Sequence, residues 1–206
     1  VASVQYRLAP EHHFPTGLLD CYAAAKALFT NRFLLNTKPE DIAIAGDSAG
    51  GNLAAAVCLM ARETGEFTPG KQILIYPALN NCYTDQSPYP SVKENGEGYL
   101  LTAKKMENYL TLYQSSPKDR ENPYFAPLLA KDLSNMPDTL ILTAELDPLR
   151  DEGEAYGERL KEAGNKVEIH RISEAFHGFF ALGIKFLHVQ ESFEYMNAFL
   201  KENEGS

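Results

Sequence analysis

Short apolar runs alternate with segments of helical spacing along most of this chain, and no other feature constrains its fold as strongly. Residues 41–47 (DIAIAGD) and 71–79 (KQILIYPAL) are nearly continuous apolar runs, typical of strands that are covered on both faces of a sheet. The expected strands are 1–8, 41–47, 71–79, 138–145 and 166–173. The expected helices are 17–35, 49–63, 102–114, 150–163 and 179–201. Strands that alternate with helices favour an α/β fold with a mostly parallel sheet and flanking helices.

Residues 80–137 interrupt this alternation. The segment is rich in proline and tyrosine and contains one clear amphipathic helix, near 102–114. It is too long for a simple connection between two strands. We therefore predict a core formed by residues 1–79 and 138–206, and a cap formed by the insertion at 80–137.

The charge and the cysteine content exclude several classes of function. The 206-residue chain has a formal net charge of −9 and no long basic run, so nucleic acids and anionic membrane surfaces are poor partners. No apolar run approaches the roughly 18 residues that a membrane-spanning helix needs. Three widely spaced cysteines, Cys21, Cys58 and Cys82, fit neither a disulfide framework nor a zinc site, and they indicate a reducing, cytoplasmic location.

A single serine between glycines lies where the first of these apolar strands meets the following helix. The pattern G-x-S-x-G is formed by Gly46, Asp47, Ser48, Ala49 and Gly50, and Gly51 follows it. At such a turn the serine takes a strained backbone conformation that aims its oxygen away from the sheet, and the residues two before and two after it must be small. The helix directs free N–H groups to the same point, so the Ala49 N–H is a candidate oxyanion donor. The alternative is a serine that only caps the helix, followed by small packing residues.

A serine nucleophile needs a base, and the chain has five histidines. His177 follows the last predicted strand and precedes a helix, at the carboxyl edge of the sheet where the serine also lies. The other histidines are His12 and His13 in the loop after residues 1–8, His170 within a strand, and His188 within a helix. The adjacent pair His12–His13 is not expected to bind a metal, because neighbouring side chains diverge and no third ligand is near. His177 is therefore the predicted base.

The base in turn needs an acid, expected at the end of the preceding strand. The candidates there are Glu145, Asp147, Asp151 and Glu152. Asp147 is the first acid clear of the strand, and the proline after it fixes the loop. Asp151 and Glu152 open a helix, where acids commonly interact with the helix dipole. The resulting chain order of serine, aspartate and histidine is that of α/β-hydrolases, so Asp147 is the predicted acid.

Four longer motifs occur in order along the chain: YRLAPEHHFP (6–15), GDSAGGNLA (46–54), DPLRDEG (147–153) and FHGF (176–179). Together they resemble the hormone-sensitive-lipase-like branch of the α/β-hydrolase esterases. The resemblance implies hydrolysis of short- to medium-chain carboxylic esters through an acyl-enzyme, with Ser48 as nucleophile, His177 as general base and acid, and Asp147 as its orienter. It also implies a small-molecule ester as partner, no metal, no organic cofactor and, by analogy, a homodimer.

The chain departs from the family pattern near its beginning. The family carries an HGG or HGGG stretch upstream of the motif at 6–15, where it supplies oxyanion N–H groups, and the chain lacks that stretch. We therefore expect an N-terminally truncated α/β-hydrolase fold, the C-terminal part of an esterase of roughly 300 residues, with Ala49 as the evident oxyanion donor. The family strand between those matching 1–8 and 41–47 is also missing, so either these two strands pair or another segment fills the gap.

Three hypotheses about function stay open. The first is a serine carboxylesterase, whose activity would fall below about pH 6 because the base must be unprotonated. The second is a catalytically silent fragment, which the missing oxyanion stretch favours. The third is a small-ligand-binding protein on the same fold, which the presence of His177 disfavours. Peptidases and thioesterases use the same three residue types, but the family motifs favour esters.

Overall fold

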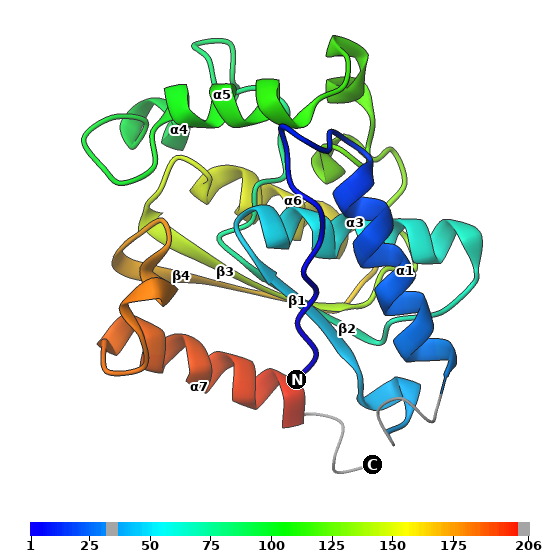
Figure 1. Cartoon of the computed structure of the whole chain (residues 1–206). Coiled ribbons are helices and arrows are strands. Elements are labelled where there is room, and N and C mark those ends of the chain that lie inside the picture. The colour runs from blue at the N-terminus through cyan, green and yellow to red at the C-terminus, as the bar shows by residue number, and fades with distance from the viewer. Residues whose placement is uncertain (32–36, 202–206) are drawn as a thin grey trace.

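A computed structural model describes residues 1–31 and 37–201, and a four-stranded parallel sheet lies at the centre of the described chain (Figure 1). The strands are β1 (Ala43–Asp47), β2 (Lys71–Ile75), β3 (Asp138–Leu146) and β4 (Val167–Phe176). They lie in the order β1-β2-β3-β4, and every neighbouring pair is parallel. The carboxyl ends of the strands therefore meet at one edge of the sheet, where the loops after β1, β3 and β4 can converge.

Helices cover both faces of this sheet. On one face lie α3 (Ala49–Thr64) and α6 (Arg150–Glu162), and on the other lies α7 (Leu187–Lys201), as Figure 1 shows. Outside the insertion, the described residues also form α1 (Thr16–Thr30), which packs on α3, and the 3-10 helices η1 (Pro39–Asp41) and η4 (Phe179–Leu182). Because both faces are covered, every residue of β2 is buried, as its apolar sequence predicts. None of the described helices has the length and apolar character to cross a membrane.

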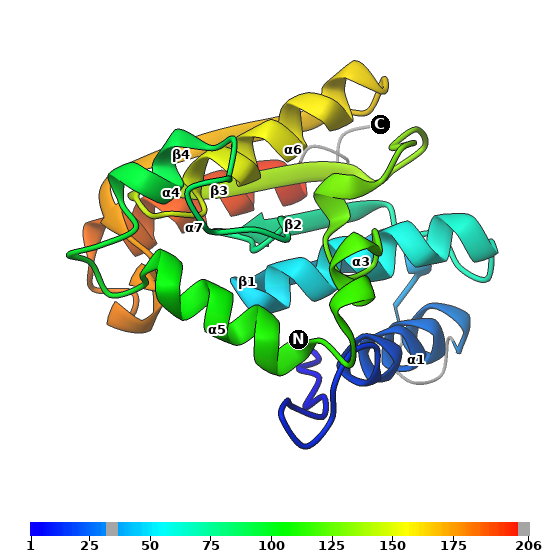
Figure 2. The ribbon, with the colours of Figure 1, turned by 90° about the horizontal axis from the view of Figure 1, so that it is seen from above.

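The connection between β2 and β3 contains helices and no strand among its described residues. It holds α4 (Pro90–Glu94), α5 (Ala103–Tyr113), η2 (Pro117–Glu121) and η3 (Pro127–Leu129). In Figure 1 α4 and α5 run across the top of the molecule, above α3 and α6. The view from above shows α5 on the same side as β1 and the N-terminal segment (Figure 2). We call residues 80–137 the insertion; their division from the core as a cap stays a prediction.

The predicted strand at 1–8 is wrong in this structure. These residues have no strand pairing, and β1 pairs only with β2 among the described residues. Side chains hold the segment instead: the backbone N–H and guanidinium of Arg7 bond to Asp20 of α1 at 2.7–3.0 Å, and Tyr6 packs on a buried apolar cluster. An apolar, β-branched sequence favours extended backbone, but a strand also needs a neighbour with free backbone groups. Neither of the two expected ways of closing the sheet beside β1 is observed.

Several other predicted elements differ in their bounds; β1 starts at Ala43 instead of residue 41, and β4 continues past residue 173 to Phe176. α1 ends at Thr30, whereas the predicted helix continued into residues 32–36, which lie outside the described part of the chain. β2 ends just before Tyr76, because the positive φ of 33° at this residue is incompatible with a continuing strand. The predicted helix at 179–201 is divided into η4 and α7 by a turn at Gly183, where φ is 78° and glycine is favoured.

A buried lysine at the start of β2 fastens α7 to the sheet. Lys71 Nζ donates to the carbonyl oxygens of Phe199 and Leu200 at 2.7 and 3.0 Å, and it lies 5.2 Å from the centre of the Phe199 ring. These carbonyl groups belong to the last turn of α7, where they have no partner within the helix and carry the negative end of its dipole. The ammonium group therefore satisfies the helix end and links it to the sheet.

We predict that Lys71→Met lowers the free energy of unfolding by about 2 kcal/mol, because two charge-assisted hydrogen bonds are lost and two carbonyl groups lose their partner. Urea denaturation followed by circular dichroism measures the change. Lys161→Met is the matched control, because Lys161 is exposed on α6 and its ion pair with Glu158 lies at the surface. Equal midpoints for the two variants would contradict the role of Lys71.

Candidate active site

Ser48 joins β1 to α3 through a strained turn. Its φ of 54° and ψ of −116° form a conformation that costs on the order of 1–3 kcal/mol in a residue other than glycine. Backbone hydrogen bonds to the end of β2 and to the loop after it hold the turn. The Ser48 N–H donates to the carbonyl oxygen of Ile75, the last residue of β2, at 2.9 Å, and the Ser48 carbonyl oxygen accepts from the Ala78 N–H in the loop at 3.2 Å. A Cβ atom on Gly46 would overlap the carbonyl group of Gly50, so glycine is required two residues before the serine.

After the serine, the position that must stay small is Gly51 rather than Gly50. A Cβ atom on Gly50 would meet only Asp47 Oδ1, at the ordinary contact distance of 4.0 Å. A Cβ atom on Gly51 would lie 2.8 Å from Pro77 Cβ, which is too close for the packing as it stands. The prediction that a side chain two residues after the serine would clash is therefore wrong, and α3 makes its close approach one residue later.

The structure brings Ser48, His177 and Asp147 together from the ends of three strands. Ser48 Oγ lies 2.8 Å from His177 Nε2, and His177 Nδ1 lies 2.7 Å from Asp147 Oδ2. The serine follows β1, the aspartate follows β3 and the histidine follows β4, at the carboxyl edge of the sheet. Although Ser48 occupies the N-cap position of α3, its side chain makes no capping hydrogen bond. The interpretation of Ser48 as a helix cap alone is therefore wrong.

Asp147 is fully buried, and both of its carboxylate oxygens have a partner. Oδ2 faces His177 Nδ1, and Oδ1 accepts from the Leu149 N–H at 2.9 Å. A buried carboxylate is costly without such partners, so the two contacts fix its position. The neighbouring candidate acid Glu145 points elsewhere and accepts from the Glu174 N–H at 2.7 Å.

The other histidines lie away from this group. His13 Nδ1 lies 2.8 Å from a carbonyl oxygen of α5, His170 stacks on Tyr195 with ring centres 3.8 Å apart, and His188 lies in α7. Within the part of the chain that the structure describes, no group of three or more His, Cys, Asp or Glu side chains could hold a metal ion.

Tyr76 connects the serine turn to the histidine, a role that no sequence pattern indicated. Its side chain is buried, and its ring centre lies 4.9 Å from that of His177. Its hydroxyl donates to Asp47 Oδ2, next to Ser48, at 3.3 Å. Burial, together with the Asp47 carboxylate, raises the pKa of Tyr76, so the phenol stays protonated and continues to donate at neutral pH. The position of Tyr76 depends on the turn that ends β2, which the apolar run at 71–79 does not indicate.

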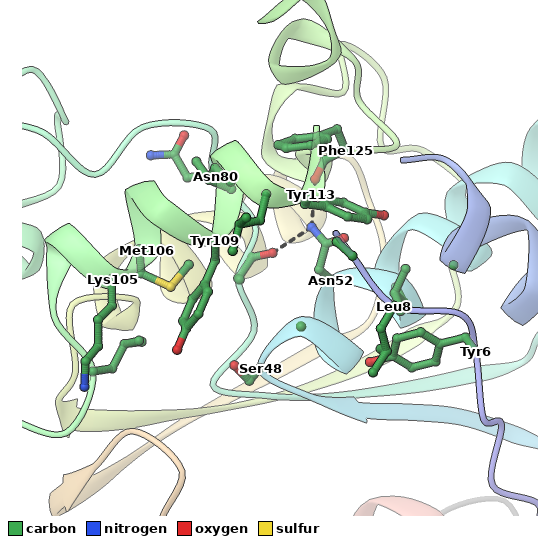
Figure 3. A pocket seen from close by; sticks show the side chains of 18 of the residues that line it. Tyr6, Leu8, Ser48, Asn52, Asn80, Lys105, Met106, Tyr109, Tyr113 and Phe125 are labelled. Atoms are coloured by element: carbon green, nitrogen blue, oxygen red, sulfur yellow. Dashed lines mark hydrogen bonds between the residues drawn. The ribbon is translucent and has the colours of Figure 1, made fainter. Parts of the chain in front are cut away.

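A cavity of about 650 Å³ opens at Ser48. Figure 3 shows Met106 and Tyr109 of α5 on one side of Ser48, and Tyr6 and Leu8 on the other. Of the other aromatic side chains in the insertion, the cavity is lined by Tyr113 and Phe125. Its lining is mainly apolar. Ala49, in the first turn of α3, also lines the cavity, and its backbone N–H has no acceptor within the helix, so it can serve as a polar donor there.

Asn52 ties the helix of the serine to the insertion. It is buried on α3, one turn after Ser48, and its Nδ2 donates to the carbonyl oxygens of Ala78 at 2.8 Å and Phe125 at 2.9 Å, drawn as dashed lines in Figure 3. Both acceptors lie beside the cavity. One amide group therefore holds two walls of the cavity against the helix that carries the serine.

Glu152 holds the chain after β2 in place, a role that its position in the sequence did not indicate. It is fully buried, and its Oε1 accepts from the Leu79 N–H at 2.7 Å, the Asn80 N–H at 3.2 Å and the Tyr83 hydroxyl at 2.7 Å. Burial raises the pKa of Glu152 to about 8 despite these donors, and the nearby Asp147 carboxylate adds to the increase. In sequence it resembles any acid in the first turn of a helix, so no local signal distinguishes it.

A family model described as "alpha/beta hydrolase fold" matches residues 1–181. The chain belongs to this family. The match confirms the fold class, and it agrees with the hormone-sensitive-lipase-like branch that the motifs indicated.

Several of its relatives are named as esterases or ester hydrolases. The chain is 41% identical over 180 residues to an arylesterase of Saccharolobus solfataricus, covering 87% of this chain and 57% of the relative. It is 40% identical over 190 residues to a carboxylic ester hydrolase of Mycobacterium tuberculosis, covering 88% of this chain and 49% of the relative. The solved structure of a hyperthermophilic esterase from Pyrobaculum calidifontis superposes with a TM-score of 0.88 at 42% identity, covering 98% of this chain and 65% of the other. The chain thus spans about half to two thirds of these relatives.

We predict that Glu152→Gln removes part of the pH dependence of stability. A folded-state pKa of about 8, above the ordinary 4.5, means that the folded protein binds more protons than the unfolded chain between these values. The contribution of Glu152 to stability is therefore present at low pH and declines as the pH rises through that window. The melting temperature of the wild type should fall relative to the variant between about pH 5 and about pH 9.

Thermal unfolding followed by circular dichroism across this pH range makes the comparison. Glu158→Gln is the matched control, because Glu158 lies exposed on the same helix. Its melting curve should follow that of the wild type at every pH. A constant difference between the wild type and Glu152→Gln over the whole range would show that the carboxyl does not titrate as expected.

Proposed function

We propose that this chain carries the catalytic residues of a serine carboxylesterase, which hydrolyses short- to medium-chain carboxylic esters through an acyl-enzyme. The observation that carries the proposal is the hydrogen-bonded series Ser48–His177–Asp147 beside a mainly apolar cavity. The names of the relatives, arylesterase, carboxylic ester hydrolase and esterase, support ester chemistry over the peptidase and thioesterase alternatives.

In the first half-reaction, Ser48 attacks the ester carbonyl carbon. His177 Nε2, 2.8 Å from Ser48 Oγ, accepts the hydroxyl proton as the bond to carbon forms. Asp147 holds the other ring nitrogen, so that the proton-free nitrogen faces the serine, and it stabilises the imidazolium that results. The oxyanion accepts a hydrogen bond from the Ala49 N–H, at the positive end of the α3 dipole. The alcohol leaves with the proton that His177 carries.

The second half-reaction releases the acid. Water takes the place of the alcohol, and His177 removes its proton as the oxygen attacks the acyl carbon. The tetrahedral intermediate uses the same oxyanion donor. When it collapses, Ser48 Oγ leaves and regains its proton from His177, so the enzyme returns to its starting state without a net change.

The cavity and the insertion support the choice of substrate. The side chains of Met106, Tyr109 and Leu110 on α5 give the space beside Ser48 an apolar wall that suits short and medium acyl chains. In this proposal the insertion at 80–137 acts as a cap, because one face of α5 contributes to that wall. A homodimer and a cytoplasmic location stay predictions.

We predict that the chain hydrolyses p-nitrophenyl butyrate and that Ser48→Ala lowers kcat at least about a thousandfold, because the nucleophile is lost. Release of p-nitrophenol, followed by its absorbance, measures both rates. Ser115→Ala is the matched control, because Ser115 is an exposed serine of the insertion that does not line the cavity.

A phosphonate ester probe adds a reading that does not depend on turnover. Mass spectrometry should find one adduct, on Ser48, in the wild type and in Ser115→Ala, and none in Ser48→Ala. If the folded wild type neither turns over the ester nor forms the adduct, the proposed function is wrong for this chain.

A further inference from the structure

We propose that Ser91 and Asn95 of the insertion are positioning residues for Asp147, because their side chains fasten the backbone loop that carries this carboxylate. The proposal rests on the proposed esterase function. It assigns the insertion a part in the geometry of the reacting groups, in addition to its contribution to the cavity wall.

Side-chain donors from α4 and the residue that follows it reach carbonyl groups around the acid. Asn95 Nδ2 donates to the carbonyl oxygens of Glu145 at 3.2 Å and of Asp147 at 3.4 Å. Ser91 Oγ donates to the carbonyl oxygen of Pro148 at 2.9 Å. The insertion therefore contacts the backbone on both sides of Asp147 and at Asp147 itself, from Glu145 near the end of β3 to Pro148 in the loop.

Two further hydrogen bonds join Ser91 to Asp151 at the start of α6. This helix lies beside α4 in both views (Figures 1 and 2). The Ser91 N–H donates to Asp151 Oδ2 at 2.7 Å, and the Asp151 N–H donates to Ser91 Oγ at 3.2 Å. An ion pair adds to these contacts, since Arg150 lies 2.8 Å from Glu94 Oε2. Burial alone would raise the pKa of Asp151, but hydrogen bonds from Arg150 and Ser91 lower it, so this acceptor stays ionised at neutral pH.

Both residues are buried, and neither lines the cavity. Ser91 is fully buried and Asn95 nearly so, which means that their polar atoms have exchanged hydration for these partners. Because they lie outside the lining of the cavity, they are not placed to bind the substrate. Any effect on the reaction has to pass through the loop that they hold.

The position of that loop decides how His177 is oriented. Asp147 Oδ2 lies 2.7 Å from His177 Nδ1, and the other ring nitrogen faces Ser48 Oγ, so no second acid holds the imidazole among the described residues. A displacement of about 1 Å at a reacting group can cost on the order of a hundredfold in rate. Loss of a donor from the insertion should therefore lower kcat, while KM, which depends on the cavity, should change little.

The test compares Ser91→Ala and Asn95→Ala with Asn108→Ala, which removes an exposed asparagine of α5 in the same insertion. The first measurement is the proton NMR signal of His177 Nδ1–H, which is strongly deshielded when it bonds to a buried carboxylate and which needs no turnover. His177→Ala identifies the signal. We expect it to move upfield or to broaden in both test variants and to stay in place in Asn108→Ala.

The second measurement is kcat and KM for p-nitrophenyl butyrate. We expect kcat to fall about tenfold in each test variant, with KM within about twofold of the wild type. Circular dichroism establishes that each variant is folded. If Asn95→Ala does not fold, Ser91→Ala, which removes a single oxygen atom, provides the test by itself.

The two measurements separate this proposal from the one on which it rests. An unchanged His177 signal in a folded Ser91→Ala variant would overturn the positioning role, whatever the activity. A changed signal in the test variants, together with a wild type that neither turns over the ester nor forms the phosphonate adduct, would support the positioning role and contradict the proposed function.

Discussion

The strained backbone of Ser48 is the constraint on which the rest of the site depends. At a φ of 54° the residue occupies a conformation that costs on the order of 1–3 kcal/mol, and in this conformation its Oγ lies 2.8 Å from His177 Nε2. The turn persists because its N–H and carbonyl oxygen bond to Ile75 and Ala78, and because Gly46 leaves room for the first turn of α3. Strain at the serine is therefore balanced by the strand and loop beside it.

Two buried carboxyl groups after β3 support opposite ends of the hydrogen-bonded series. Asp147 holds His177. Glu152 accepts hydrogen bonds from the N–H groups of Leu79 and Asn80, and these residues directly follow Ala78, whose N–H bonds to Ser48. Their surroundings differ: one oxygen of Asp147 faces an imidazole, while all of the hydrogen bonds to Glu152 come from neutral donors, and burial raises the pKa of Glu152 to about 8. The loop and the first turn of α6 thus connect the acid to the nucleophile through the interior of the protein.

Much of the fold could be predicted because its signals are local. The parallel sheet follows from the alternation of apolar strands with helices, and α3, β3 and α6 lie within one or two residues of their predicted bounds. The predictions failed where an element depends on a distant neighbour. Residues 1–8 have the composition of a strand but no strand partner in the described part of the chain, and β2 stops before Tyr76, whose ring lies against His177. Composition cannot indicate such partners, because they belong to other parts of the chain.

By itself the sequence determined the strand-turn-helix around Ser48 and the order of serine, aspartate and histidine, since both follow from short motifs and from strands that end at one edge. Only the tertiary structure decided which acids are buried, and it distinguished Glu152 from the partly exposed Asp151, its neighbour in the same helical turn. It also decided that polar side chains of the insertion reach the loop of Asp147. The physical reason is that burial and hydrogen-bond partners are set by what packs against a residue, and the packing segments are distant in sequence.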